Sequence, residues 1–232
     1  EQLVQSEKMA ALGAMMAEIA HEIRNPLVSI GGFARRLEKK IKNEDEKKYI
    51  DIILSEVTRL EGIIHDNLSY IKDISPQVHE AGLNATIDEM LALYEDEFKQ
   101  RGIRLEKDFS PSLPPFLVDA QQIKQAAINI LTNAMEAMEN GGTLTIRTYP
   151  LPETREAVLE IGDTGPGISP EAMHNIFNPY YTTKARGTGL GLSITHRIIK
   201  AHKGRIEVRN REGGGAVFII KLPYPLPENG KA

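Results

Sequence analysis

Hydrophobic residues at helical spacing organise the first third of the chain. From about residue 12 to residue 37 they recur every three or four positions, in one stripe made of Leu12, Met16, Ile19, Ile23, Leu27 and Ile30. After a polar turn at residues 43–46 the same spacing continues to about residue 74, at Ile50, Ile53, Val57, Leu60, Ile64 and Ile71. Two long helices with narrow apolar seams cannot each bury them alone. The pattern therefore predicts a helical hairpin that pairs with a second copy into a dimeric four-helix bundle.

The pattern beyond residue 76 predicts a mixed domain of helices and strands. Helices are expected at about residues 85–101, 119–140 and 192–201, the second with Asp119 as its N-cap. Alternating or β-rich runs predict strands at residues 103–107, 116–118, 143–149, 157–161, 205–209 and 216–222. A polar link is expected at residues 75–83, and a long polar, Gly-rich loop at residues 163–191. These elements predict an α+β two-layer sandwich.

The length of the chain allows one large domain or two modest ones, and the change of pattern favours two. The predicted boundaries are residues 1–76 for the helical domain, 77–225 for the α+β domain and 226–232 for a loose tail. The chain has 232 residues, of which 41% are hydrophobic and 26% charged, as in ordinary globular proteins. A formal net charge of -4 argues against nucleic acid as the main partner. Because the chain has no cysteine, disulfides and thiolate metal sites are excluded.

The chain carries no signal for a membrane. No apolar run approaches the roughly 18 residues that a membrane span needs, and the polar start is not a signal peptide. We therefore expect a cytoplasmic chain without membrane contact. It opens in the middle of a helical pattern, which suggests the end of a larger protein that is either membrane-anchored or wholly cytosolic.

A histidine on the first predicted helix faces water. His21 lies about 160 to 200° around the helix from Ile19 and Ile23, on the side opposite the apolar stripe. Its neutral imidazole is a nitrogen nucleophile at pH 7. Asn25 lies one turn further on the same face, and the carboxylate of Glu22 can accept one ring N–H. The residues by themselves leave open an ordinary surface histidine or a nucleophile that awaits an electrophile.

Two asparagines and an aspartate in the second domain have the chemistry to bind phosphate, metal and base. Asn129 and Asn133 are four apart on one helix, and an amide can hold Mg²⁺ through its oxygen and phosphate through its NH₂. Asp163 directly follows a strand and opens a turn with Gly165 and Gly167. Its carboxylate can accept a hydrogen bond from the amine of adenine, although the same residues also build purely structural turns.

A glycine cluster leads straight into the next predicted helix. Its residues, Gly187, Thr188, Gly189, Leu190 and Gly191, would leave backbone N–H groups and a helix N-terminus free to cradle phosphate oxygens. The cluster is not a dinucleotide-binding fingerprint, because a polar loop precedes it in place of a strand. It is not a P-loop either, because no Gly-Lys-Ser/Thr follows.

Taken together, these segments resemble bacterial sensor histidine kinases of two-component systems, over about residues 8–222. The sequence H-E-I-R-N-P-L at residues 21–27 is similar to their phosphoacceptor box. N-I-L-T-N-A at residues 129–134, the two glycine segments, and F-N-P-Y-Y-T-T-K at residues 177–184 resemble the N, glycine and F boxes of the GHKL-type ATP-binding domain shared with gyrase-type ATPases and Hsp90. The form of the boxes is most similar to the nitrogen-regulatory and sporulation-kinase branch.

The resemblance implies a role for each matching residue. Asn133 would coordinate Mg²⁺, Asn129 would bind phosphate or the water shell of the metal, and Asp163 would read adenine. Lys184 and Arg186, on the expected lid, would neutralise charge on the transferring phosphoryl group. The pocket and its lid would be shaped by Gly165, Gly167, Gly187, Thr188, Gly189, Leu190 and Gly191.

The implied activity is autophosphorylation by Mg-ATP in a homodimer. His21 would accept the γ-phosphoryl group, with Glu22 as base or orienter, and would pass it to an aspartate on the receiver domain of a response regulator. Glu22 and Asn25 also match an E-x-x-N pattern associated with phosphatase activity toward that regulator, with Asn25 orienting the water. Alanine at position 216, where Thr or Ser is usual, and Lys203, where glycine is common, depart from the family pattern.

Other functions remain to be weighed against this one. The alternative is a non-catalytic, nucleotide-binding dimeric scaffold. A hydrolytic ATPase of the same superfamily would have glutamate at the position of Asn129, and an amide cannot serve as a base. A zinc hydrolase is excluded because Asn25 stands where H-E-x-x-H needs its second histidine.

Overall fold

A computed structural model describes residues 23–41, 43–71, 74–184 and 187–224. The chain divides into two compact units, the first ending at residue 73 and the second beginning at residue 74. In the part of the chain that the structure describes, no helix is both long enough and apolar enough to cross a membrane.

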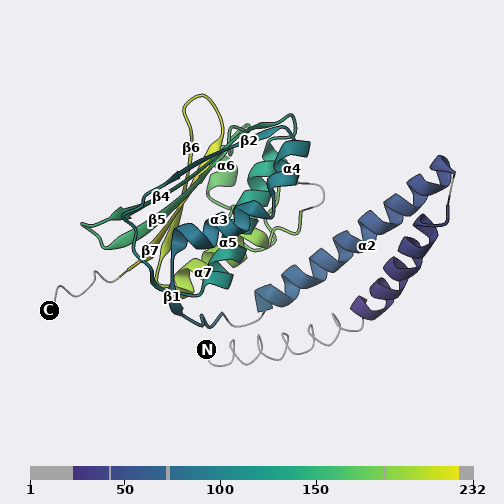
Figure 1. Ribbon diagram of the computed structural model, residues 1–232, viewed down its shortest axis with the longest axis horizontal. Helices are drawn as coiled ribbons and strands as arrows, with labels where there is room; N and C mark the ends of the chain where they lie inside the picture. Colours follow the sequence, from purple (N-terminus) through teal and green to yellow (C-terminus); the bar gives the residue numbers. More distant parts are fainter. Residues whose placement is uncertain (1–22, 42, 72–73, 185–186, 225–232) are drawn as a thin grey trace. The chain divides into compact units, whose positions relative to one another are not determined.

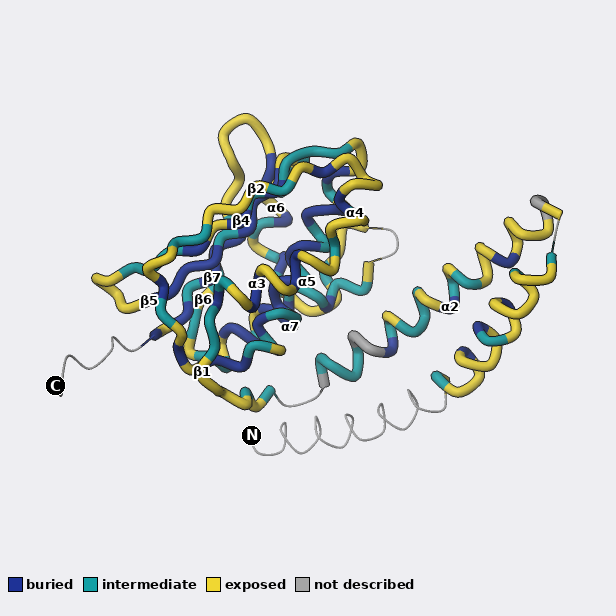
Figure 2. The backbone as a smooth tube through the Cα atoms, viewed as in Figure 1, coloured by how far each residue is buried: buried dark blue, intermediate teal, exposed yellow. Residues whose placement is uncertain are grey.

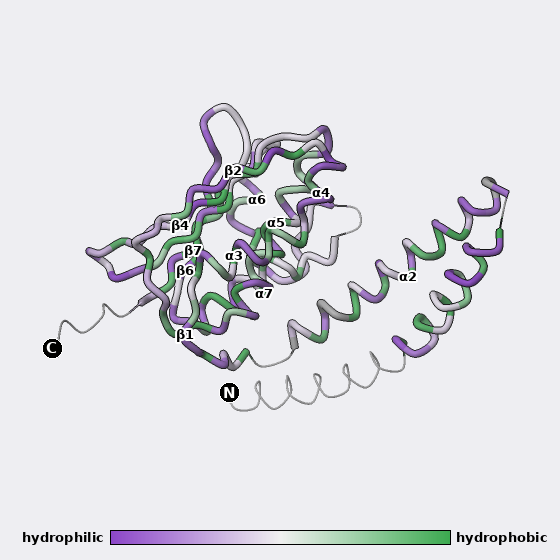
Figure 3. Tube along the Cα trace, in the orientation of Figure 1, coloured by the Kyte–Doolittle hydropathy of each residue, from purple (hydrophilic) through white to green (hydrophobic). Residues whose placement is uncertain are grey.

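The first unit is a helical hairpin, as predicted. Residues 23–38 form one helix and α2 (Glu44–Ile71) forms the other. Leu27, Val57 and Ile64 make a buried cluster, against which the partly buried Leu60 and Leu68 pack. Green and purple stretches alternate along both helices in Figure 3, as expected for helices with one apolar side. Val57, Leu60 and Ile64 therefore take the predicted places in the seam. The predicted Ile53 is instead 41% exposed, and Leu68 packs in the seam although it was not predicted.

The predicted stripe on the first helix is only partly correct. Leu27 is buried, whereas Ile23 is 44% exposed and Ile30 is 48% exposed. The seam continues instead through Gly31 and Ala34, because a small residue lets the two helices approach closely. A Cβ on Gly31 would lie 3.2 Å from Cγ1 of Val57. The first helix thus has a second apolar side that the hairpin does not cover.

The second unit is built on a five-stranded mixed sheet (Figure 1). The strands lie in the order β2 (Ile103–Phe109), β4 (Gly142–Leu151), β5 (Glu156–Gly162), β7 (Ala216–Pro223) and β6 (Arg205–Asn210). β2 and β4 are parallel, and the other neighbours are antiparallel. One face is covered by α3 (Leu83–Ala92), α5 (Ala120–Ala137) and α7 (Gly191–Ala201). The predicted two-layer sandwich is confirmed.

The core of this unit lies between the sheet and its helices. Figure 2 shows the buried residues concentrated in the central strands and in the helices that cover them. On β4 the side chains of Leu144, Ile146 and Thr148 are buried, whereas Arg147, which points to the opposite face, is exposed. This alternation is the period of two expected for a strand with one covered face. The sheet therefore presents an apolar side to the helices, while its other side combines polar side chains with a small apolar cluster of Val158, Val217 and Ile219.

Three details of the second unit differ from the prediction. The single helix expected at residues 85–101 is two helices, α3 and α4 (Glu95–Gln100), interrupted at residues 93–94. The expected polar link contains β1 (His79–Ala81), which pairs with β3 (Phe116–Val118). The expected long loop contains the short helix α6 (Pro170–Met173). These elements are short and rest on backbone pairing and capping, so side-chain periodicity gives little sign of them.

Asp119 joins three segments at the start of α5. Its Oδ1 accepts hydrogen bonds from the backbone N–H groups of Gln121 and Gln122, both at 3.1 Å, which confirms the predicted N-cap. Its Oδ2 accepts from the backbone N–H of Gln77 at 2.9 Å, and its own N–H donates to Nε2 of His202 at 3.1 Å. The start of α5, the segment that enters β1 and the end of α7 are thereby held together.

A tight turn between β6 and β7 approaches the end of β5. Gly213, Gly214 and Gly215 all have positive φ angles, of 88°, 108° and 92°. A Cβ on Gly215 would lie 2.0 Å from the carbonyl oxygen of Asp163, whereas one on Gly213 would meet nothing within 4 Å. Gly215 is therefore required for space as well as for its backbone angle, and Gly213 for its angle alone.

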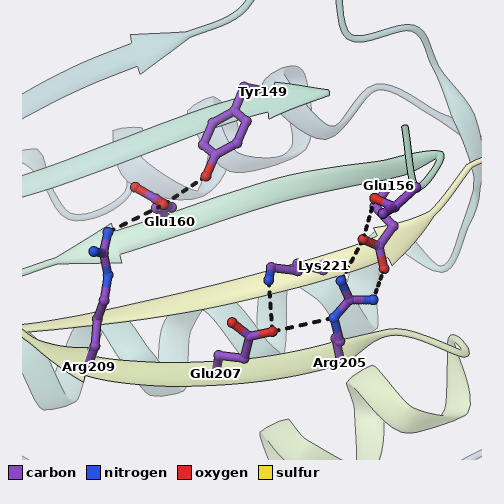
Figure 4. Close-up of polar contacts among 8 residues, drawn as sticks. Tyr149, Glu156, Glu160, Arg205, Glu207, Arg209 and Lys221 are labelled. Atoms are coloured by element: carbon purple, nitrogen blue, oxygen red, sulfur yellow. Dashed lines mark hydrogen bonds and ion pairs between the residues drawn. The ribbon is translucent and has the colours of Figure 1, made fainter. Parts of the chain in front are cut away.

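A polar network covers the face of the sheet that has no helices (Figure 4), formed by Tyr149, Glu156, Glu160, Arg205, Glu207, Arg209 and Lys221. The guanidinium of Arg205 contacts both carboxylate oxygens of Glu156. Lys221 donates to Glu207 at 2.7 Å, and this hydrogen bond lowers the pKa of Glu207. The hydroxyl of Tyr149 donates to Oε1 of Glu160 at 2.8 Å. Four strands are linked through these side chains.

Tyr149 predicts how stability changes at high pH. Burial first, and then the hydrogen bond to Glu160, raises its pKa from 10.0 to about 12. The folded protein holds this proton more tightly than the unfolded chain, so the stabilisation is complete below pH 10 and is lost as the pH rises towards 12. We expect Tyr149→Phe to unfold in urea with a weaker dependence on pH across this window. Tyr180→Phe, at a tyrosine that is 62% exposed, is the control. Equal pH dependence in Tyr149→Phe and the unmodified chain would contradict this assignment.

The two glycines of the β6–β7 turn predict unequal losses of stability. Gly213→Ala adds a Cβ in open space, so its cost is that of a positive φ angle, about 1 kcal/mol. Gly215→Ala adds a backbone clash to the same strain and should cost about 3 kcal/mol or more. Thermal unfolding of both variants measures the difference. Similar melting temperatures for the two would show that the turn relaxes freely, against this expectation.

Candidate functional site

The two predicted asparagines of α5 are held by hydrogen bonds in different ways. Asn133 Nδ2 donates to the backbone oxygen of Asn129 at 2.8 Å, so its Oδ1 is turned outward, where it accepts from Nζ of Lys184 at 2.7 Å. Asn129 Nδ2 donates to the backbone oxygen of Gly191 at 2.9 Å and to Oγ1 of Thr195 at 3.3 Å. Asn129 thus ties α5 to the first turn of α7, and Asn133 offers an oxygen to a cation.

Asp163 is buried at the end of β5, with only 4% of its surface exposed. Its Oδ1 accepts from the backbone N–H of Gly165 at 2.8 Å and from that of Ala216 at 3.2 Å. Neither bond uses the second carboxylate oxygen, Oδ2. A buried carboxylate is costly unless its oxygens find donors. The geometry therefore suits a ligand that brings an N–H group to Oδ2.

The glycine segments lie against the same elements. Gly165 and Gly167 occupy the turn that follows Asp163, and this turn is tied to β6 by two hydrogen bonds between Asn210 and Ile168. Gly189 has a φ of 68°, and a Cβ on it would lie 2.5 Å from the backbone carbon of Tyr180. The chain leading into α7 therefore packs directly on the segment at residues 177–184. The other members, Gly187, Thr188, Leu190 and Gly191, run from there to the N-terminus of α7.

Lys184 is brought from its loop onto α5. Besides Asn133, its ammonium contacts the carboxylate of Glu136, one turn further along the helix. Among the predicted basic residues, Arg186 lies outside the described residues. The structure therefore joins one of the two expected lid cations to the helix that carries the asparagines.

The histidine box is only partly described. His21 and Glu22 lie outside the residues that the structure describes. Asn25 lies in the helix at residues 23–38 and is exposed. The expected roles of these three residues remain predictions.

Sequence reasoning missed two contributors to the site. Glu136 carried a signal, because it follows Asn133 by three residues and so lies on the same face of the helix. The backbone N–H of Ala216 carried none, because its contact with Asp163 depends on how β5 and β7 pair. The alanine that departs from the family pattern therefore still contributes its main chain to the site.

The described residues offer few protein ligands to a metal. They contain no group of three or more acidic, cysteine or histidine side chains placed to hold one. Mg²⁺ is often held by one or two protein oxygens together with substrate phosphates. The outward oxygen of Asn133, which already bonds an ammonium group, fits such a ligand set.

Two family models match the chain, one on each unit. The "His Kinase A (phospho-acceptor) domain" matches residues 11–73. The "Histidine kinase-, DNA gyrase B-, and HSP90-like ATPase" family matches residues 118–226. The first match includes the position of His21, and the second includes Asn129, Asn133 and Asp163.

Two curated bacterial proteins are similar along nearly the whole chain. The signal transduction histidine-protein kinase AtoS of Escherichia coli (strain K12) is 35% identical over 95% of this chain and 36% of its own length. Sporulation kinase E of Bacillus subtilis (strain 168) is 34% identical over 96% of this chain and 30% of its own length. The chain therefore spans about a third of each of these relatives. The second relative agrees with the branch that the boxes suggested.

Solved structures of the histidine kinase ThkA are also similar. Its catalytic domain is 35% identical, with a TM-score of 0.59, over 64% of this chain and 96% of that domain. ThkA in complex with the response regulator protein TrrA is 36% identical, with a TM-score of 0.70, over 95% of this chain and 64% of the ThkA chain. With a phosphoacceptor domain followed by an ATPase domain, the chain belongs to the sensor histidine kinases of two-component systems.

Proposed function

We propose that this chain is a protein-histidine kinase: it binds ATP with Mg²⁺, transfers the γ-phosphoryl group to His21, and passes that group to an aspartate of a response regulator. The observation that carries the proposal is the presence of a phosphoacceptor domain and an ATPase domain in one chain. The ATPase domain would supply the electrophile that a lone surface histidine lacks.

The nucleotide site is proposed to lie between α5, the turn after β5, and α7. Asp163 Oδ2 is available to accept from the amine of adenine, since the two hydrogen bonds of its carboxylate use Oδ1. The N-terminus of α7 and the glycines before it suit phosphate oxygens. Asn133 would hold the metal, which when bound neutralises charge on the transferring phosphoryl group. Asn129 would act at the phosphates while its NH₂ keeps α7 in place.

The transfer to His21 needs an attacking nitrogen and a leaving group. The lone pair of a ring nitrogen forms the N–P bond as the bond between the γ-phosphorus and the ADP oxygen breaks. Glu22 is proposed to accept the N–H of the other ring nitrogen, which stabilises the positive charge that develops on the ring. Water competes poorly, because Asn129 is an amide and cannot remove a proton.

A second copy is proposed to cover the hairpin. The two helices leave large apolar side chains exposed, and an exposed apolar patch of this kind is typical of an interaction surface. Those between 41% and 68% exposed in the described hairpin are Ile23, Val28, Ile30, Phe33, Leu37, Tyr49, Ile52 and Ile53. A homodimeric four-helix bundle would remove them from water. Such a bundle also agrees with the phosphoacceptor family match.

The proposed downstream partner is the receiver domain of a response regulator. Support comes from ThkA, which was solved in complex with the response regulator protein TrrA and is similar to this chain over 95% of this chain and 64% of the ThkA chain. Phosphohistidine is a reactive phosphoryl donor, so an aspartate of the partner would serve as the acceptor. The exposed Asn25 would then orient water for the reverse signal, the removal of phosphate from the regulator.

Incubation with ATP labelled on its γ-phosphate tests the division of labour between the two units. The unmodified chain should acquire acid-labile, alkali-stable label, and His21→Gln should acquire none while it still binds nucleotide. Asp163→Asn should lose both label and nucleotide affinity. The amide has only one acceptor oxygen, so at this buried position either the backbone donors or the amine of adenine would face an NH₂ group. Tight nucleotide binding without label in the unmodified chain would favour the non-catalytic scaffold instead.

Dephosphorylation of a phosphorylated receiver domain tests Asn25. We expect Asn25→Ala to autophosphorylate at the normal rate but to dephosphorylate the receiver at least about tenfold more slowly, because the attacking water loses its orienting amide. Asn43→Ala, at an exposed asparagine of the same unit, is the matched control. An unchanged phosphatase rate in Asn25→Ala would rule out the proposed role of its amide.

A further inference from the structure

Two oxygen atoms on α5 hold the same positive charge. Nζ of Lys184 donates to Oδ1 of Asn133 at 2.7 Å and also contacts Oε2 of Glu136. Asn133 and Glu136 are three residues apart, so their side chains leave the same face of the helix. An amide oxygen and a carboxylate oxygen thus form a small cation site on the surface of α5.

The orientation of the Asn133 amide commits its oxygen to this site. Its nitrogen donates to the backbone oxygen of Asn129 at 2.8 Å, which leaves Oδ1 to face Lys184. An ammonium group is a compact, strongly hydrated cation that bonds the same hard oxygens that Mg²⁺ prefers. The two oxygens around Lys184 are therefore of the kind that can also bind a divalent metal, with waters and phosphates completing its ligand set.

The negative charge of Glu136 is unfavourable in a pocket that binds a polyanion such as a nucleotide. A carboxylate one turn from Asn133 repels the phosphates of a nucleotide unless a cation lies between them. Lys184 supplies that cation in the structure, yet it comes from the segment at residues 177–184 and not from α5. Its departure would break no hydrogen bond within the helix. Glu136 would then need a replacement cation.

We propose that Glu136 and Asn133 together form the metal site of the nucleotide pocket, and that Lys184 fills this site until the metal–nucleotide complex displaces it. The inference rests on the proposed function. Glu136 binds the metal or one of its waters and so adds a negative oxygen to the ligand set. The displaced ammonium group of Lys184 becomes available to the terminal phosphate. The exchange couples the position of the Lys184 loop to metal binding.

The metal dependence of nucleotide binding tests the proposal without any need for kinase activity. The dissociation constant of a fluorescent ADP derivative is measured with excess Mg²⁺ and again with EDTA. The constant in EDTA divided by the constant in Mg²⁺ gives the factor by which the metal strengthens binding. In Glu136→Gln the ratio should fall about fivefold or more, because binding without metal improves as the repulsion is removed and binding with metal weakens.

Glu139→Gln is the matched control. It removes an equal charge three residues further along, and the described contacts of Lys184 do not include Glu139. Its ratio should equal that of the unmodified chain. A ratio in Glu136→Gln that matches the control overturns the proposal. If the unmodified chain binds no nucleotide under either condition, the proposed function itself fails, which is a different result.

A second set of variants, built on Lys184→Met, distinguishes two roles of Glu136: a ligand of the metal, or a residue that only holds Lys184 in place. Lys184→Met removes the ammonium group and leaves both oxygens in place. If Glu136 serves the metal, adding Glu136→Gln to Lys184→Met still lowers the ratio. If the effect of Glu136→Gln disappears in this background, Glu136 acts only through Lys184, and its place in the metal site is overturned. Glu136 is 52% exposed, so neither variant should alter the melting temperature by more than a degree or two.

Discussion

The end of β5 and the start of β7 meet so closely that no side chain fits at Gly215. This approach lets the main chain of Ala216 pair with Asp163 and also donate to its carboxylate. A buried carboxylate is therefore held by backbone N–H groups in place of a charged side chain. An arginine would engage both oxygens as a bidentate pair. The backbone donors engage Oδ1, and no hydrogen bond to Oδ2 is found among the described residues, so Oδ2 can serve the proposed ligand. The position of this carboxylate thus depends on Gly215, which lets the two strands approach.

The rest of the site depends on how firmly α5 is placed. The helix is fixed at its start by Asp119, which also holds Gln77 and His202, and along its side by the bonds of Asn129 to α7. Groups further along the helix, such as Asn133, therefore project from a rigid element. Precise placement of a few polar atoms is what binding and phosphoryl transfer require. Through Gln77, Asp119 also connects this helix to the segment that precedes β1 in the sequence.

Much of this arrangement follows from local features of the sequence. The periodicity of the strands and the Asp119 cap are local, and the structure confirms them. The placement of Asn133 on a helix and Asp163 after a strand agrees with the structure too, while their roles stay predictions. The break at residues 93–94 contains neither glycine nor proline, so nothing local marks it. The contact between Lys184 and Glu136 joins residues 48 apart and depends on the path of a loop.

Charge and hydrogen-bonding capacity together explain why such a site would preserve ATP. Asn129 uses its NH₂ to hold α7, so it contributes geometry and no basicity. The ammonium group of Lys184 has no lone pair to offer, and Glu136 is engaged with Lys184 in the structure and, as proposed above, with the metal once the nucleotide is bound. A water molecule near the phosphates would therefore find no free base among these three residues. Under the proposed function, the γ-phosphoryl group waits for a nucleophile that carries its own lone pair, and the imidazole of His21 is such a nucleophile.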